Sequence, residues 1–493
     1  MKSSHLSTTE VNSINVKRLT TRLMPSHDRV LIRPFIPTDP NRIQRILGRI
    51  MSLPGDEVER ELKRVLDDFS ERHSNIEREL LQHYELVRKW ALTDIVPDDR
   101  LKLVIGAYFT QEYSLESAAL FNPSIVPHPN QRDLGKGAQR FILSLRATGE
   151  GHVSSIVFRE GIIEPDFSLS IRKPTPFVTE PDKVPNVQFE KALFSRKLVE
   201  LDAWNDISQS LLNELPKHFR LRELEEAIKE ARRNGNRSPA LHQTLETVLA
   251  LALSNYEVQF SPDQRTSERA IFPASPSQRN GIEDARFVLF TDDDGKRKYY
   301  ATFTAFDGNV ILPQLMETDD FFNFRFVTLN GPGVKNKGMA LFPRRINGCF
   351  AMLSRQDNEN IFLMYSDNIH FWYDPIKIVR PTYSWEYVQL GNCGSPIELD
   401  EGWLVLSHGV GPMRRYCIGA FLLDRDDPTR LIGRLKQPLL QPNENEREGY
   451  VPNVVYTCGA MVYREKLLLP YAMSDYATAF AIIDVAEILR HLS

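Results

Sequence analysis

The chain has 493 residues, of which 42% are hydrophobic and 26% are charged, and its formal net charge at pH 7 is −4. That length is sufficient for two or three domain-sized units. The balanced charge argues against a nucleic-acid partner, which requires a concentrated basic surface. The polar N-terminus lacks the apolar segment of a secretory signal, and no apolar run is long enough to cross a bilayer, so we expect no membrane partner.

The four cysteines lie far apart and form no C-x-x-C pair; they are Cys349, Cys393, Cys417 and Cys458. This spacing favours neither a disulfide framework nor a zinc site. No H-x-x-x-H pair or cluster of His and Cys points to another metal. We therefore expect no bound metal, cysteines that mostly serve as small apolar fillers, and a reducing, cytoplasmic location.

The first 98 residues are predicted to form an N-terminal arm and a helical extension. Residues 1 to about 40 are polar at first and then extended, a loose arm with "RVLIRPFIP" as a possible edge strand. From Asn41 to about Leu92, apolar residues recur at spacings of three, four and seven, which is typical of amphipathic helices. Charged residues fill the other positions and predict a solvated face.

Residues 99–493 are predicted to form a β-rich domain that a helical insertion interrupts. Short strand-like runs follow Arg100, among them "LKLVIGAYF", "RFILSLRA" and "VSSIVF". Over residues 187–254 the pattern becomes helical, with Ser238 and Pro239 as a typical helix start. Strand-like sequence resumes at Tyr256 and continues almost to the end.

Loosely similar apolar segments recur in the C-terminal half. They start at Glu283, Leu341, Ser395 and Pro452, which are 58, 54 and 57 residues apart, and each is followed by a turn and a second apolar run. An earlier copy starts at Asn122 if the helical block is an insertion. Five such units predict a mainly β fold, a five-bladed β-propeller with four short strands in each blade. An ordinary all-β sandwich with chance similarity is the alternative.

The starts of these segments are unusually polar. In a propeller the first strand of each blade lines the central channel, so residues at these starts converge on one funnel. A structural core would not choose such residues, because unpaired buried charges are costly. We therefore predict a shared polar site to which the following residues contribute: Asn122, Arg146, Asp284, Arg286, Lys337, Arg355, Gln389, His408 and Asn453.

Seven motifs follow one another along the chain: "FNPSIV" (121–126), "GIEDARFVLF" (281–290), "KGMALFPRRINGCFAMLSR" (337–355), "IFLMYSDNIHFW" (361–372), "GSPIELDEGWLVLSHGV" (394–410), "YCIGAFLLDRDDP" (416–428) and "VPNVVYTCGAMV" (451–462). They resemble, in order, those of glycoside hydrolase family 130, the β-mannoside phosphorylases and related β-mannosidases. The resemblance covers roughly residues 100–160 and 256–490 and leaves out both helical regions. It implies a five-bladed β-propeller with the active site in the central funnel.

The resemblance assigns the catalytic acid to Asp284. Ala285 stands where the family often has proline, which changes local stiffness and not the chemistry. A glycosidase normally needs two carboxyl groups, whereas a phosphorylase needs only the proton donor because phosphate is the nucleophile. In phosphorylases of this family the proton is thought to pass through the mannose 3-hydroxyl, and a single displacement inverts the anomeric carbon. Inorganic phosphate is then a co-substrate, and no cofactor is expected.

The phosphate ligands implied by the resemblance are Lys337, Arg355, Gln389 and His408, with Tyr416 nearby. A phosphate dianion needs several donors of this kind. Lys337 stands where arginine is common, Gly338 where asparagine is common, and Gln389 where lysine is common, so the set has one cation fewer than the family pattern. In the hydrolase branch glutamates replace phosphate ligands. None of the four positions is acidic here, which favours phosphorolysis.

The residues predicted to hold the mannosyl unit are Asn122, Arg146, Glu283 and Arg286. Each has a structural alternative that the sequence leaves open. Asn122 can satisfy a turn, Arg286 can pair with Glu283 or Asp284, and Glu283 is expected to orient its neighbours.

The phosphate set also has alternatives. His408 can be a satisfied core histidine, and Lys337 and Arg355 can be solvated charges. Asp307 and Asp475 are expected to shape turns or lie near the rim, with substrate contact left open for Asp475.

These features together predict an inverting β-mannoside phosphorylase, a hexosyltransferase that takes a β-mannoside or manno-oligosaccharide and phosphate and gives α-mannose 1-phosphate. One alternative is an inverting β-mannosidase of the same family, and another is a non-catalytic carbohydrate-binding propeller. Two amphipathic helical regions beside a complete propeller also predict a homo-oligomer, in which the helices bury their apolar stripes.

Overall fold

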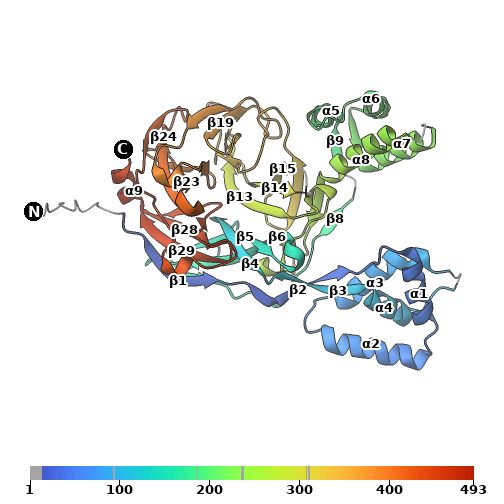
Figure 1. The fold of residues 1–493 in the computed structure, drawn as a ribbon. Helices are drawn as coiled ribbons and strands as arrows, with labels where there is room; N and C mark the ends of the chain where they lie inside the picture. The colour runs from blue at the N-terminus through green and yellow to red at the C-terminus, as the bar shows by residue number, and fades with distance from the viewer. Residues whose placement is uncertain (1–13, 93–94, 186, 235–237, 307, 309–310) are drawn as a thin grey trace, which may run out of the picture.

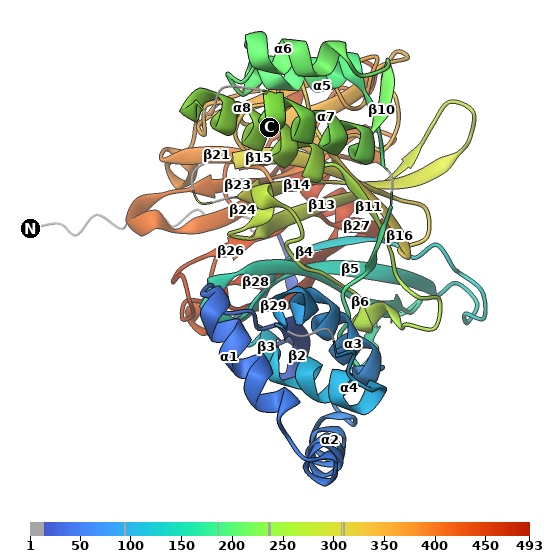
Figure 2. The same ribbon diagram turned by 90° about the vertical axis from the view of Figure 1, so that its right-hand side faces the viewer.

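The computed structural model describes residues 14–92, 95–185, 187–234, 238–306, 308 and 311–493. Within them, five larger antiparallel sheets form one β-rich body, from which two helical units project (Figure 1). A view turned by 90° shows the two helical units at opposite ends of this body (Figure 2). The fold is mainly β, as predicted, and both expected helical regions contain helices.

The first two sheets lie next to each other and pack through a shared core. Sheet 1 contains β4 (Ala119–Pro127), β5 (Gln139–Thr148), β6 (Ser154–Ile163), β7 (Leu169–Ile171) and β12 (Ala270–Ile271). Sheet 2 contains β13 (Ile282–Thr291), β14 (Arg297–Phe306), β15 (Ile311–Thr318), β16 (Asn323–Thr328), β11 (Tyr256–Gln259) and β8 (Asp182–Val184).

In each of the next two sheets, a short first strand lies at one edge. Sheet 3 contains β17 (Ala340–Leu341), β18 (Phe350–Ser354), β19 (Ile361–Ser366) and β20 (Ile376–Val379). Sheet 4 contains β21 (Gln389–Asn392), β22 (Ile397–Leu399), β23 (Gly402–Val410), β24 (Tyr416–Leu423) and β25 (Leu431–Arg434).

Sheet 5 joins the two ends of the chain. It contains β26 (Val455–Tyr456), β27 (Met461–Tyr463), β28 (Lys466–Met473), β29 (Ala477–Asp484) and, from the N-terminal region, β1 (Lys17–Leu23). Strand β1 pairs antiparallel with β29, which precedes the last helix, α9 (Val485–His491). The expectation of a loose arm is therefore wrong for residues 17–23, because the sequence has no local signal for a partner strand more than 450 residues away.

The N-terminal helical unit lies between two paired strands. Strand β2 (Ser26–Pro34) pairs with β3 (Thr110–Glu116), and the edge strand expected in "RVLIRPFIP" is largely β2. Between these strands lie α1 (Pro40–Met51), α2 (Gly55–Phe69), α3 (Ile76–Val87) and α4 (Asp99–Tyr108). Their buried apolar residues form one cluster that extends to Phe109, beyond residue 98, where the helical extension was expected to end.

Helix α4 corrects the interpretation of "LKLVIGAYF" as a strand. The Asp98 side chain accepts a hydrogen bond from the Leu101 amide at 2.8 Å and caps the helix start. Gly106 allows close packing on α3, since a Cβ there would lie 1.9 Å from the Leu80 carbonyl oxygen. The short β-branched run suggested a strand, but the cap and the tertiary contact with α3 decide for a helix.

The helical insertion has its own core. It contains β9 (Gln188–Glu190), α5 (Lys191–Glu200), α6 (Asp206–Asn213), β10 (His218–Arg220), α7 (Leu221–Asn234) and α8 (Pro239–Leu253). Ser238 accepts a hydrogen bond from the Leu241 amide and caps α8, with Pro239 at its first position, as predicted. The apolar side chains of this unit pack on one another around Phe189, Phe194 and Phe219.

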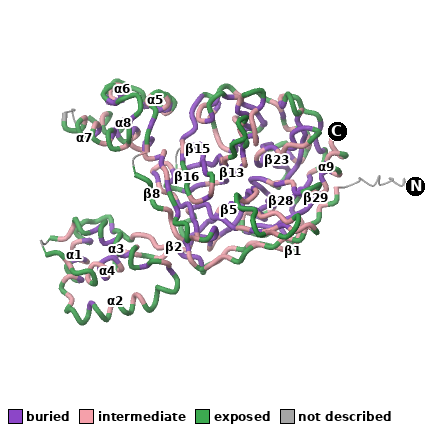
Figure 3. Tube along the Cα trace, turned by 180° about the vertical axis from the view of Figure 1, so that it is seen from behind, coloured by how far each residue is buried: buried purple, intermediate pink, exposed green. Residues whose placement is uncertain are grey.

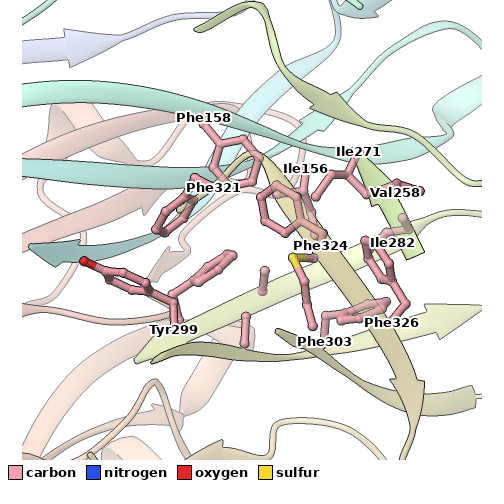
Figure 4. Packing of buried hydrophobic residues seen from close by; sticks show 14 of the residues in the cluster. Ile156, Phe158, Val258, Ile271, Ile282, Tyr299, Phe303, Phe321, Phe324 and Phe326 are labelled. Carbon is pink, nitrogen blue, oxygen red and sulfur yellow. The ribbon is translucent and has the colours of Figure 1, made fainter. Parts of the chain in front are cut away.

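Buried residues concentrate in the sheets, whereas the helical units present mostly exposed outer surfaces (Figure 3). An aromatic cluster between sheets 1 and 2 includes Phe158, Phe321 and Phe324, whose rings stack or meet edge to face (Figure 4). Each helical unit buries its apolar stripe within itself. The helices therefore do not need a second copy of the chain to bury their apolar stripes. The oligomeric state stays a prediction.

Candidate active site

Two polar residues meet at the edge strands of sheets 1 and 2. Asn122 of β4 donates a hydrogen bond from Nδ2 to Oδ1 of Asp284 in β13 at 2.7 Å, and both residues are buried. Each sits where the strand register breaks, and each has a left-handed backbone, with φ of 48° and 54°. Asn and Asp tolerate this conformation better than other residues with a side chain. The matching bulges point the two side chains at each other.

Arg146 binds both acids of the "EDAR" segment. Its Nη2 donates to Glu283 Oε1 at 2.8 Å, and its Nη1 lies 3.6 Å from Asp284 Oδ1. Its Nε donates to Ser154 Oγ at 2.9 Å, which fixes the guanidinium. Arg146 is in β5, opposite Phe121, so its expected place on a first strand is wrong. It reaches the site from the second strand because its side chain is long.

Arg286 is the most enclosed cation of the site, with only 2% of its surface exposed. It donates to the Cys393 carbonyl at 2.7 Å, to the Tyr456 hydroxyl at 2.7 Å and to the Asp284 carbonyl at 2.9 Å. Its Nη2 also lies 3.9 Å from Asp284 Oδ2. Of the two roles considered for Arg286, these contacts favour the structural ion partner over the sugar contact. They also tie sheet 2 to sheets 4 and 5.

Two cations and a histidine lie next to these residues. Lys337 Nζ is 3.8 Å from Glu283 Oε2 and is partly exposed. Arg355 is buried, donates from Nε to the Lys337 carbonyl at 3.2 Å and donates from Nη1 to His408 Nε2 at 3.0 Å. His408 is fully buried in β23, which pairs with the first strand, β21, and is not itself a first strand. Lys337, Arg355 and His408 thus form one connected set beside Glu283 and Asp284.

Two glycines make room for this set, and sequence reasoning did not identify their role. A Cβ at Gly391 would lie 2.5 Å from His408 Cε1 and 3.0 Å from Arg355 Cδ. A Cβ at Gly338 would lie 2.6 Å from Arg355 Nε, and Gly338 has a φ of +89°. Gly338, which departs from the family pattern, is therefore the residue that lets Arg355 approach the backbone.

Tyr416 and Gln389 lie at the margin of the set. The Tyr416 ring stacks on His408 with centroids 6.1 Å apart and an interplanar angle of 8°. Gln389 is half-buried at the start of β21, two residues before Gly391. Among the described residues, no hydrogen bond or ion pair joins the Gln389 side chain to the cations. Asn453 accepts a hydrogen bond from Arg447, and Asp307 lies outside the described residues.

Opposing effects set the protonation of Asp284. Burial by itself raises the pKa of Asp284, but the charges of Arg146, Arg286 and Lys337 and the hydrogen bond from Asn122 together bring it down to about 2. The carboxyl is therefore ionised at neutral pH when nothing is bound. A proton donor at this position needs a bound anion to offset the cations.

Asp475 belongs to the same electrostatic neighbourhood. It lies in the turn between β28 and β29 with a φ of 49°. Burial and the charge of Asp284 raise the pKa of Asp475 to about 6, although Arg146 opposes the shift. Sequence reasoning gave this residue little weight, because an Asp in "MSDY" matches an ordinary turn.

Burial, together with the nearby charges of Arg355 and Arg286, holds the pKa of His408 well below its usual range. His408 is therefore neutral at pH 7, and its Nε2 accepts the hydrogen bond from Arg355. Among the residues described, no group of three or more His, Cys, Asp or Glu side chains is placed to hold a metal ion. Within the same ranges, no helix is long and apolar enough to cross a membrane.

A buried carboxylate among converging arginines, next to a polar cation set, defines a site for a hydroxyl-rich or anionic small molecule. The family profile of glycoside hydrolase family 130, described as beta-1,4-mannooligosaccharide phosphorylase, matches residues 247–493. The chain belongs to this family. The matched residues include Asp284 and the whole cation set, but not Asn122 or Arg146.

Two relatives are each similar to about half of the chain. A 1,2-beta-oligomannan phosphorylase of Thermoanaerobacter sp. is 32% identical over 248 residues, which are 49% of this chain and 79% of that protein. A beta-1,2-mannobiose phosphorylase of Listeria innocua is 32% identical over 230 residues, 45% of this chain and 63% of that protein. The solved structure of the Listeria innocua beta-1,2-mannobiose phosphorylase with beta-1,2-mannobiose aligns with a TM-score of 0.46 and 23% identity, over 77% of this chain and 93% of that one.

Proposed function

We propose that this protein is an inverting β-mannoside phosphorylase, which transfers a mannosyl unit from a β-mannoside to inorganic phosphate. The observation that carries the proposal is the arrangement of Asp284 directly beside the connected set of Lys337, Arg355 and His408. Family membership and the names of the relatives agree with this chemistry. Both β-1,2 and β-1,4 linkages occur in those names, so both belong in any substrate panel.

The same proposal includes the architecture. We infer that sheets 1 to 5 are the blades of a five-bladed β-propeller, with β1 as the outer strand that closes the last blade. Support comes from the five sheets of similar plan and from Arg286, which contacts residues of three sheets at once. The site then lies in the central funnel. The cytoplasmic location and the homo-oligomer stay predictions.

The sugar end of the site is assigned to the acid group and its neighbours. Asn122 Oδ1 is buried and has no hydrogen-bond partner among the described residues. An unpaired buried acceptor is costly, and a sugar hydroxyl would satisfy it. Arg146, Glu283 and Asp475 supply further polar groups around the same point, whereas Arg286 holds Asp284 from behind. This set is suited to a mannosyl unit, whose hydroxyls both donate and accept.

The phosphate end is assigned to Lys337 and Arg355, with Tyr416 and Gln389 at its margin. Arg355 can donate its remaining N–H groups to a phosphate oxygen, while the neutral His408 keeps accepting the hydrogen bond from Nη1. Lys337 is the most accessible cation of the set and is suited to meet an incoming anion. Gln389 contributes an amide where a further charge would strengthen the site.

The reaction follows from this geometry in one displacement. A phosphate oxygen attacks the anomeric carbon while the bond from that carbon to the glycosidic oxygen breaks, and Asp284 supplies the proton that the leaving oxygen needs. The product is α-mannose 1-phosphate plus the shortened acceptor. The phosphate charge offsets the cations that keep Asp284 ionised, so phosphate binding raises the Asp284 pKa toward the value a proton donor needs.

The test is a panel of β-1,2- and β-1,4-mannobioses and longer oligomers, incubated with and without phosphate. We expect mannose 1-phosphate only when phosphate is present, and a rate that saturates with phosphate concentration. Free mannose as the main product, at a rate that ignores phosphate, would exclude a phosphorylase.

One observation favours an inverting β-mannosidase as the second candidate. Asp475 has a pKa raised to about 6 and senses the charge of Asp284. An inverting hydrolase needs such a second carboxyl group to activate water. The same panel separates the two, because a hydrolase would release mannose in the absence of phosphate and would lose that activity in Asp475→Asn.

A further inference from the structure

The helical insertion binds the loop that precedes sheet 3 through side-chain hydrogen bonds. Lys197 of α5 donates from Nζ to the Leu329 carbonyl at 2.8 Å, and Glu200, one turn later, accepts from the Gly331 amide at 2.6 Å. The two side chains also pair with each other, at 2.8 Å between Lys197 Nζ and Glu200 Oε2. One helical turn thus holds a carbonyl and an amide of the same loop.

This pair is built into the interface and is not a surface ion pair. Lys197 is only 5% exposed, and burial lowers the Lys197 pKa while Glu200 opposes that shift. Burying an ammonium group is costly unless it is paired and hydrogen-bonded, and here every bond is to Glu200 or to the loop backbone. The fold therefore keeps a charged contact at a place where an apolar contact would give equal or greater stability.

The loop is also bound on the side opposite α5, by the segment that follows β19. Gly331 has a φ of +107°, and a Cβ there would lie 2.1 Å from the Trp372 carbonyl oxygen. Asn330 exchanges backbone hydrogen bonds with His370 and Trp372. The segment from Leu329 to Gly331 is thus held between α5 and the chain that follows β19.

Six residues further along, the same loop delivers Lys337 to the phosphate end of the site. The intervening turns are closed by bonds from the Val334 amide to Gly331 and from Gln356 to the Gly333 carbonyl. At the far end, Arg355 binds the Lys337 carbonyl and Asn392 binds the Gly338 carbonyl. With both ends tied, the position of Lys337 depends on where α5 and the segment after β19 together fix the start of the loop.

The interface beside the contact of Lys197 and Glu200 with the loop contains a cavity. A cavity of about 370 Å³ lies between the insertion and sheet 2, and its lining includes Lys197, Leu251, Thr328 and Asn330. Apolar packing therefore supports the loop poorly at this point. Hydrogen bonds carry the contact here: those of Lys197 and Glu200, and those between Asn255, which follows α8, and Thr328.

We propose that Lys197 and Glu200 are positioning residues for phosphate binding, and that the helical insertion sets the affinity for phosphate by fixing the loop that carries Lys337. The inference rests on the proposed function, because it assigns phosphate to the Lys337 end of the site. It gives the insertion a role at the site although none of the insertion's described residues contributes a side chain to the acid group.

The experiment compares Lys197→Met, Glu200→Ala and Glu200→Gln with the wild type and with Lys229→Met, which removes an exposed lysine from α7 of the same insertion. We measure KM for phosphate, KM for mannobiose and kcat. Loss of a hydrogen bond to a charged group allows a shift of the loop that raises KM for phosphate about tenfold. KM for mannobiose stays within about twofold. Glu200→Gln retains an acceptor for the Gly331 amide although it loses the charge paired with Lys197, so its KM for phosphate stays closer to the wild type than that of Glu200→Ala.

Hydrogen exchange of the peptide that covers residues 329–338 gives the second readout. Exchange rises in Lys197→Met and Glu200→Ala and not in Glu200→Gln or Lys229→Met. Variants that only lose thermal stability, with an unchanged KM for phosphate, would overturn the positioning role. Failure of the wild type to form mannose 1-phosphate is a separate result, which refutes the proposed function and with it the phosphate role of the loop.

Discussion

The proposed acid half and the proposed phosphate half of the site are built in different ways. The acid half, around Asn122, Arg146 and Asp284, sits on regular strands at two matching bulges, and its side chains bind one another directly. The phosphate half depends on a loop lysine, on an arginine that follows β18, and on two glycines that leave room for them. The fold itself orders the first half, whereas neighbouring segments must hold the second.

The largest effect is expected in the acid half, from Asp284→Asn. Asparagine keeps the shape and the contact with Asn122 but cannot donate the proton, so kcat falls by about 10²- to 10⁴-fold. Steady-state kinetics and circular dichroism check activity and folding together. Asp293→Asn, in the exposed turn between β13 and β14, is the matched control and keeps wild-type kcat. A folded Asp284→Asn protein with near-normal turnover would remove Asp284 from the chemistry.

In the phosphate half, Lys337→Met should raise KM for phosphate by about tenfold, since a charged hydrogen bond to the anion is lost. KM for the mannoside should hardly change, because Lys337 lies outside the sugar end. The exposed neighbour Lys335, changed to Met, controls for loop charge. Equal increases in both KM values would mean that the two halves are not separate.

The pH dependence of stability separates two carboxyl groups within the acid half. The folded pKa of Asp475, about 6, lies above that of an unfolded aspartate, about 3.9. This carboxyl therefore does not lower the free energy of unfolding below pH 4, but lowers it increasingly as the pH rises from 4 through 6. Asp284 has the opposite sign: its depressed pKa contributes stability above pH 4 that is lost as the pH falls through about 2.

Asp475→Asn should accordingly gain about 1–3 kcal/mol of unfolding free energy at pH 8 relative to pH 4, compared with the wild type. Urea unfolding at both pH values measures the gain, and mannobiose kinetics should show that activity falls while stability rises. A difference from the wild type that is independent of pH would show that Asp475 is not held in a destabilised ionised state.

The smallest effect is expected from Gln389→Lys, which restores the cation that the family pattern has at this position. An added charge at the margin of the phosphate half should lower KM for phosphate by about threefold, since partly exposed charges contribute little. Phosphate titrations at low and high ionic strength check it, and the gain should shrink with salt. A rise in KM would show that Gln389 does not face the anion.

The sequence predicted which residues gather around Asp284 better than it predicted which strands carry them. The motif around Asp284 and the five similar segments follow from local patterns, which is why they were recoverable. The second-strand origin of Arg146 and His408 was missed, because reach depends on side-chain length and register and not on sequence order. Pairing of β1 with β29 was invisible for the same reason: strand partners far apart leave no local trace.

The phosphate half shows where resemblance alone was insufficient. Gly338 was noted only as a departure from the family pattern, yet it makes room for Arg355. The helical insertion lay outside every matched motif, and its hold on Leu329 and Gly331 could be found only in three dimensions. Helix α4 was misread because its β-branched run outweighs its cap when only the sequence is read.

The central claim is that phosphate, and not water, attacks the anomeric carbon opposite Asp284. The most direct measurement follows the first product of mannobiose cleavage in phosphate buffer by ³¹P and ¹H NMR. The account predicts α-mannose 1-phosphate as the first product, formed in step with the shortened acceptor. Free mannose formed at the same rate without phosphate, or the β anomer of mannose 1-phosphate, would contradict it.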